Sequence, residues 1–196
     1  MSAALRYTPV MRNMTGILKP VVTALFVGLG VPVAGTAQEG GVDALLEQLS
    51  DPETQNWQAL ERQVRAEWSK SGSAAMDLLL ERGREALEEE EVDVAIEHLT
   101  ALTDHAPDFA EGWNARATAF FQKGRYGPAL ADIRRALALN PRHFEALTGL
   151  AVILQQLGYE EDALSAWRAV ETIHPHRPQL KDAIEKLEKE TGGTAL

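Results

Sequence analysis

The feature that most constrains the fold of this chain is a set of positions that recur every 34 residues. Proline and alanine recur at this interval, and bulky or small residues occupy further matching positions. The matching sets are Pro107, Pro141 and Pro175; Ala95, Ala129 and Ala163; Leu79, Trp113 and Leu147; Gly83, Ala117 and Ala151; and Leu99, Ile133 and Trp167. Such self-similarity indicates a repeat protein, in which each unit packs mainly against its neighbours.

Each unit has the pattern of two helices joined by a turn. In the middle unit, Trp113 and Phe120 lie seven residues apart with a small residue at i+4, so all three share one helical face. Gly124 ends this helix, because a left-handed residue costs glycine least. A second apolar stripe begins at Ala129, and Pro141 stops that helix. We therefore expect an all-α chain, which the abundance of Leu, Ala and Glu beyond residue 42 also favours.

The pattern resembles the tetratricopeptide repeat (TPR), W-x2-L-G-x2-Y…A-x3-F…P over 34 residues. The resemblance covers about 100 of the 196 residues and implies an α-solenoid of three helix–turn–helix repeats. The repeats are expected at about 76–109, 110–143 and 144–176, within a repeat domain of residues 73–176. Glu90 stands where the other copies have glycine, so its turn is expected to be longer or strained. Arg82 and Arg116 replace a leucine of the pattern, and we expect their stems to pack while the guanidinium groups reach water.

Helical segments are expected on both sides of the repeats. Residues 38–72 form an N-terminal helical segment and linker, with a short helix at 42–49 and a second from Pro52, capped by Asp51, to about residue 70. Residues 177–196 form a capping helix, with one apolar stripe, and a flexible tail.

Residues 1–37 have the pattern of a bacterial secretory signal peptide. Three basic residues and no acidic one precede a short apolar core and small residues. Gly35 and Ala37 occupy positions −3 and −1 of a cut before Gln38. The apolar core is much shorter than the about 20 residues of a stable membrane span, although a retained N-terminal anchor is the alternative. Translation can start at Met1, or at Met11 or Met14. We therefore expect the periplasm as the location.

The TPR resemblance implies a concave groove, lined by the first helix of each repeat, that binds a peptide or partner helix. The expected partner-binding positions are Leu80, Arg84, Asn114, Thr118, Phe121, Gln122, Thr148, Val152 and Gln155. Asp77, Glu111 and Glu145 occupy another groove-facing position of the three repeats. A clamp for a C-terminal carboxylate, known in one variant of the family, is absent here. The expected role is a scaffold or adaptor in cell-envelope assembly, with a protein or peptide partner of unknown identity.

Several other functions lack support in the sequence. The chain has no cysteine, no serine in a nucleophile elbow and no helical i, i+4 histidine pair, so we expect no catalytic residue, no metal site and no cofactor. Cleavage before Gln38 would change the formal net charge from −10 to −13, and such a surface repels nucleic acid and anionic membranes. An alternative is self-association through Trp57 and Trp68, so both a monomer and a homodimer remain open.

Overall fold

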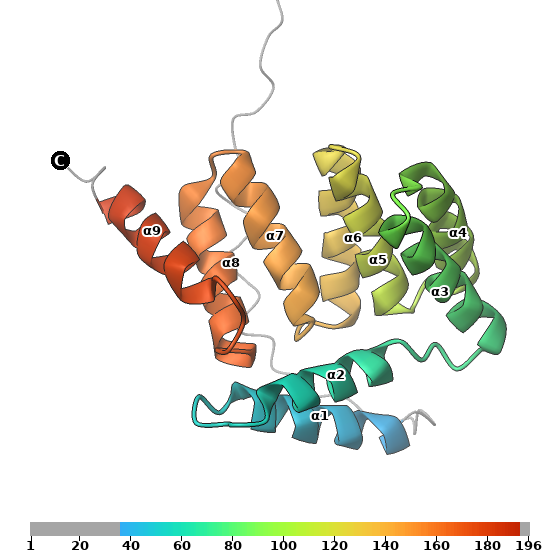
Figure 1. Ribbon diagram of the computed structural model, residues 1–196, viewed down its shortest axis with the longest axis horizontal. Helices are drawn as coiled ribbons and strands as arrows, with labels where there is room; N and C mark the ends of the chain where they lie inside the picture. The colour runs from blue at the N-terminus through green and yellow to red at the C-terminus, as the bar shows by residue number, and fades with distance from the viewer. Residues whose placement is uncertain (1–35, 193–196) are drawn as a thin grey trace, which may run out of the picture. The chain divides into compact units, whose positions relative to one another are not determined.

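The computed structural model describes residues 36–192, which form nine α-helices and no strand (Figure 1). The predicted signal peptide, except for its last two residues, lies outside this described part, as do residues 193–196 of the predicted tail. The helices are α1 (Thr36–Ser50), α2 (Trp57–Trp68), α3 (Ala74–Glu88), α4 (Val92–His105), α5 (Ala110–Gln122), α6 (Tyr126–Leu139), α7 (Phe144–Gln156), α8 (Glu160–Ile173) and α9 (Leu180–Gly192). No helix among the described residues is both long and apolar enough to cross a membrane.

Helices α3 to α8 form three hairpins that stand side by side, which confirms the predicted solenoid of three repeats (Figure 1). Gly124 and Gly158 end the first helices of the second and third hairpins with φ values of 70° and 76°. Glu90 takes the same left-handed conformation with φ 62°. The first turn is therefore strained rather than longer, because a side chain with a Cβ is unfavourable in this region.

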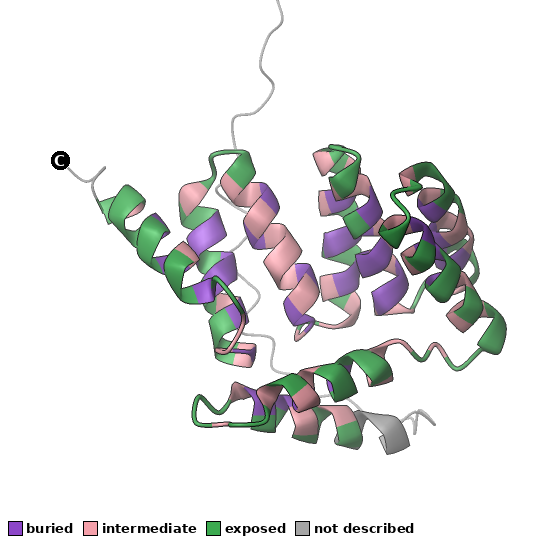
Figure 2. Ribbon diagram, viewed as in Figure 1, coloured by how far each residue is buried: buried purple, intermediate pink, exposed green. Residues whose placement is uncertain are grey.

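The apolar stripes face one another between the helices, as the buried positions in Figure 2 show. In the first repeat the core is tight enough that a Cβ on Gly83 would lie 2.5 Å from Leu99 Cγ. At the other end, Leu180 and Leu187 of α9 pack against Trp167 and the rest of the last hairpin. This packing gives α9 the predicted capping role.

The start of the second N-terminal helix differs from the prediction. Helix α2 begins at Trp57, five residues after Pro52, and residues 51–56 form turns. The carboxylate of Asp51 accepts a hydrogen bond from the backbone N–H of Glu53 at 2.9 Å. Asp51 therefore stabilises a local turn instead of capping a helix, which is the alternative use of this residue type.

The tryptophan face of α2 packs against the chain's own repeats. The ring of Trp68 stacks on His143 with 4.3 Å between centroids and lies 5.0 Å from Phe144. The ring of Trp57 lies parallel to His176 at 5.8 Å. The observation that suggested self-association thus has an intramolecular explanation, and α1 and α2 form a hairpin across the ends of the last repeats (Figure 1).

The expectation that the Arg116 guanidinium reaches water is wrong. Its Nε and Nη2 donate to the two carboxylate oxygens of Asp132 at 2.7 and 2.9 Å, and its Nη1 donates to Thr103 at 2.7 Å. The Arg116 and Asp132 side chains are only 14% and 7% exposed. Arg116 therefore joins three successive helices, α4, α5 and α6, through a largely buried ion pair.

Candidate functional site

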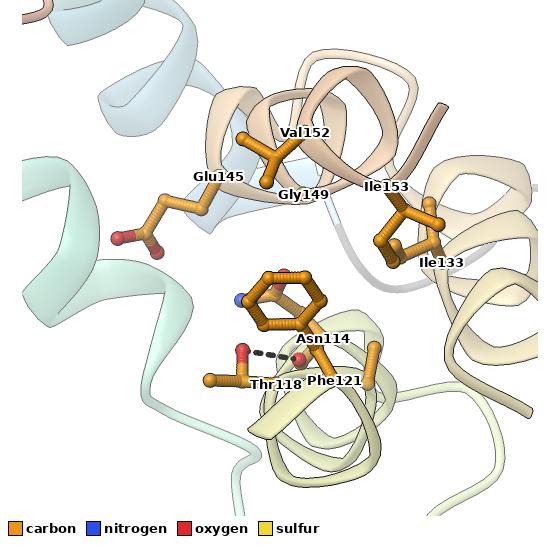
Figure 3. Close-up of a pocket in the computed structure, with 9 residues that line it drawn as sticks. Asn114, Thr118, Phe121, Ile133, Glu145, Gly149, Val152 and Ile153 are labelled. Carbon is orange, nitrogen blue, oxygen red and sulfur yellow. Dashed lines mark hydrogen bonds between the residues drawn. The ribbon is translucent and has the colours of Figure 1, made fainter. Parts of the chain in front are cut away.

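A pocket of about 130 Å³ lies between α5 and α7, the first helices of the second and third repeats (Figure 3). We call it the α5–α7 pocket, and its lining consists of Asn114, Ala117, Thr118, Phe121, Ile133, Glu145, Gly149, Val152 and Ile153. The lining is mostly apolar, and at position 149 no side chain fills the space. Apolar cavities of about 150 Å³ hold one benzene molecule, so this pocket has room for one apolar side chain of a partner.

The polar groups of the pocket are held in fixed positions by their neighbours. Asn114, Thr118 and Phe121 project from α5 toward α7 (Figure 3). The Thr118 hydroxyl donates to the backbone carbonyl of Asn114 at 3.1 Å. The amide of Asn114 is buried and donates to the Glu111 carboxylate at 3.3 Å. An approaching partner therefore meets a mostly apolar surface with the Thr118 hydroxyl and the Glu145 carboxylate among its few polar groups.

A wider groove of about 830 Å³ shares Val152 with the α5–α7 pocket. We call it the α2–α9 groove, because those two helices supply most of its charged residues. The groove is lined by Trp57, Gln58, Glu61, Arg62 and Arg65 of α2; Thr148, Val152 and Gln155 of α7; Trp167 of α8; Arg177, Pro178 and Gln179 of the following turn; and Asp182, Ala183 and Lys186 of α9. Apolar and polar surfaces for a partner thus lie next to one another.

Part of the predicted groove is occupied by the chain itself. Asp77 and Glu145 occupy the same position in the first and third repeats. Asp77 accepts hydrogen bonds from the backbone N–H and the hydroxyl of Ser71 at 2.7 and 2.6 Å. Glu145 pairs with Arg65 of α2 at 2.9 Å. Arg65 and Ser71 therefore bind two acidic side chains that we expected to face a partner.

Glu111, the corresponding acid of the second repeat, lies in a buried ionic network. Arg84 donates to one of its oxygens at 2.5 Å, and His143 Nε2 lies 2.8 Å from the other. His143 Nδ1 accepts from the N–H of Ala146, so Nε2 carries the proton that it donates to Glu111. Burial opposes the ionised form of Glu111, but His143 and Arg84 outweigh it and lower the pKa of Glu111 below its ordinary value of 4.5. Glu111 is therefore a buried structural anion.

Within the described residues, one group has the composition and spacing to hold a metal ion. Glu111, His143 and Glu145 each offer an atom, and these atoms lie within 4.8 Å of one another. Arg84 and Arg65 already neutralise the two carboxylates, and the histidine N–H points at Glu111. The donors therefore fit the protein's own cations better than a metal ion. Burial and the nearby Glu111 charge raise the pKa of Glu145, although Arg65 opposes the shift.

The structure brings most of the predicted partner-binding residues to these two surfaces, with three exceptions. Leu80 is wrong as a groove residue, because it is 2% exposed and packs in the core of the first repeat. Arg84 is committed to Glu111 and to the hydroxyl of Ser69, and Gln122 is exposed but lines neither surface. The pocket holds Asn114, Thr118, Phe121 and Val152, and the groove holds Thr148, Val152 and Gln155.

The charged residues of α2 and α9 were not among the predicted site residues. These helices have no repeat pattern from which a groove position can be carried over. The sequence shows only amphipathic helices there, so the location of Arg62 and Lys186 on one surface depends on how the helices pack.

Comparison with known proteins agrees with this architecture. The tetratricopeptide repeat model matches residues 110–143. A TPR repeat-containing protein of Rhizobium etli is 33% identical over 163 residues, which cover 82% of this chain and 79% of that protein. The first TPR domain of RPAP3, solved with the HSP90 peptide SRMEEVD, aligns with TM-score 0.59 and 22% identity over 61% of this chain and 95% of the domain. MamA aligns with TM-score 0.57 and 20% identity over 79% of each chain.

The three stacked helical hairpins define a solenoid repeat protein. Because the chain is 33% identical to this Rhizobium etli protein over 163 residues, which cover most of both chains, it belongs to the tetratricopeptide repeat proteins.

Proposed function

We propose that this chain is a non-catalytic protein-interaction module that binds a partner peptide or helix, with one apolar side chain of the partner in the α5–α7 pocket. The observation that carries this proposal is the pocket itself, which opens between two neighbouring first helices and has a mostly apolar lining. Pockets of this kind bind extended or helical segments by their side-chain anchors. The RPAP3 domain, solved with a bound peptide, supports the same use of the fold.

The test fills the pocket without exposing apolar surface. Gly149 lines it, and a Cβ there would touch only Ile133 Cδ1, at 3.4 Å, so Gly149→Leu should place its side chain in the pocket. A photo-reactive amino acid at Thr118, which is exposed at the pocket edge, should cross-link the partner in living cells. We expect Gly149→Leu to abolish that cross-link while circular dichroism shows an intact helical fold.

The matched control is Leu157→Ser, which changes a 42% exposed leucine just after α7, outside the pocket. This variant should cross-link as the wild type does. A partner that is captured equally well by the Gly149→Leu protein would place the binding site on another surface.

We further propose that the protein is exported and acts in the periplasm as a scaffold or adaptor in cell-envelope assembly. The support is the sequence of residues 1–37, with its basic start, short apolar core and small residues before Gln38. Mass spectrometry of the protein from fractionated cells should give a chain that starts at Gln38 in the periplasmic fraction. An intact N-terminus in the membrane fraction would instead establish an anchored protein.

A further inference from the structure

The α2–α9 groove has a charge balance opposite to that of the whole chain. The chain carries 29 acidic and 19 basic residues. The groove is lined by more cations than carboxylates. Its cations are Arg62, Arg65, Arg177 and Lys186, and its carboxylates are Glu61 and Asp182. A basic groove on an acidic protein attracts an acidic segment while the remaining surface repels it.

Two of these cations are available to a partner. Arg65 and Arg177 both pair with Glu61, at 2.7 and 3.0 Å, so their charges are largely satisfied. Arg62 is exposed and forms no ion pair or hydrogen bond with any described residue. Lys186 is 64% exposed and has only a 3.8 Å contact with the neighbouring turn of its own helix. One available cation therefore comes from each of the two helices, Arg62 from α2 and Lys186 from α9.

The groove also provides uncharged hydrogen-bonding groups. Gln155 of α7 and Gln58 of α2 line it with their amides. Trp167 also lines it, is 6% exposed, and has a buried indole N–H without an acceptor among the described residues. Buried donors of this kind are usually paired. The two amides can pair with oxygen atoms of a ligand in the groove, whereas the Trp167 N–H lies beneath its surface.

The α5–α7 pocket itself has the reverse character. Glu145 lies at the pocket, and Glu111 is buried behind it as an anion. Arg65 is the exposed cation beside Glu145, and it is shared with Glu61. Acidic residues of a partner are therefore attracted to Arg62 and Lys186 in the α2–α9 groove and are not attracted to the α5–α7 pocket.

We propose, on the basis of the function proposed above, that the partner segment has an apolar anchor residue flanked on one side by acidic residues, which bind Arg62 and Lys186 in the α2–α9 groove. The anchor enters the α5–α7 pocket, and the chain of the partner passes over Val152, which both surfaces share. The acidic side chains are internal residues of the segment, because their contacts come from α2 and α9 rather than from a clamp for a chain end.

The experiment uses an array of end-blocked twelve-residue peptides with one central leucine and with Glu, Gln, Lys or Ser at the flanking positions. The full chain is probed against this array at low and at high salt. We expect selection of Glu on one side of the leucine only, and loss of this selection at high salt, because exposed ion pairs are screened. Arg62→Glu combined with Lys186→Glu should weaken binding of the selected peptides about tenfold or more, equivalent to about 1.4 kcal/mol.

Arg134→Glu is the matched control, because Arg134 is an exposed arginine of α6 that lines neither surface and has no ion pair with a described residue. It should leave binding nearly unchanged. Leucine-dependent binding that does not distinguish Glu from Gln or Lys overturns the acidic-partner proposal and leaves the pocket function standing. Selection of Glu that survives the Arg62 and Lys186 changes also overturns it. An array on which the wild-type chain binds nothing counts against the peptide-binding function itself, and with it against this proposal.

Discussion

Removal of the Asp132 carboxylate should destabilise the repeats strongly, because it leaves the Arg116 cation buried without its partner. The two side chains are 14% and 7% exposed and share two hydrogen bonds of 2.7 and 2.9 Å. At about 4 Å and an effective dielectric constant of about 20, unit charges attract by about 4 kcal/mol. Measured losses for one partner of a buried pair are about 3–5 kcal/mol. We expect a loss of this size for Asp132→Ala, because only the neutral hydroxyls of Thr103 and Thr100 and aromatic faces remain around the guanidinium.

Urea denaturation followed by circular dichroism measures this loss as a lower midpoint at an unchanged slope. Arg116→Leu restores the residue of the family pattern, so the double variant Arg116→Leu/Asp132→Ala should recover most of the stability, since neither charge is then left unpaired. Asp108→Ala is the surface control, because the Arg135–Asp108 pair is 43% and 88% exposed and should contribute less than about 1 kcal/mol. A loss below about 1 kcal/mol for Asp132→Ala, or a double variant as unstable as the sum of the single ones, would refute this reasoning.

Three further predictions follow from single sites. Glu90→Gly should raise the free energy of unfolding by about 1 kcal/mol, seen as a higher urea midpoint, because φ 62° is unfavourable for a residue with a Cβ. A lower midpoint would mean that the turn is not strained. Gly83→Ala should destabilise the chain by about 1 kcal/mol, because crowding of the new Cβ against Leu99 at 2.5 Å exceeds the gain in helix propensity. The double variant Gly83→Ala/Leu99→Val should relieve this crowding. Equal stability of Gly83→Ala and wild type would contradict the close packing. Burial lowers the pKa of His174 from 6.5 to about 4, although Glu61 opposes the shift. The stability contributed by the neutral ring is therefore present above pH 6.5 and is lost as pH falls toward 4, by up to about 3 kcal/mol. His174→Leu should flatten this part of the stability–pH curve, and an unchanged curve would exclude His174 as its cause.

The repeats were predictable because each of their signals is local and occurs in three copies. Gly124 marks a turn by its own backbone preference, and Ala129 and Pro141 mark a helix face and a helix end by their positions in the chain. The same matching positions also predict the solenoid, because each unit packs on the next in the same way.

Arg116 shows why the repeat pattern did not determine every side chain. The pattern places Arg116 at a position that usually holds leucine, and solvent exposure was the simplest expectation for its guanidinium. Its burial depends on Asp132 and Thr103, which come from the helices after and before it. No spacing within a single helix reveals such a partnership.

The acidic residues at one matching position of the three repeats show how a segment outside the repeat pattern changes the site. Asp77, Glu111 and Glu145 look like partner-binding positions when only the first helices are considered. In the structure Ser71 and Arg65 satisfy the outer two, and buried neighbours satisfy the middle one. Helix α2 and the link that follows it thus bind acidic side chains of the repeats that a partner would otherwise contact.

A partner is consequently left with the apolar pocket and with the groove that the hairpin of α1 and α2 helps to form. The hairpin covers acidic groups with Arg65 and adds Arg62 at the edge of the free surface. It therefore reverses the charge that the repeats alone would present to a partner. Since neither α2 nor α9 belongs to a repeat, proteins that share these repeats but differ in their flanking helices should differ in the charge of the segments that they bind.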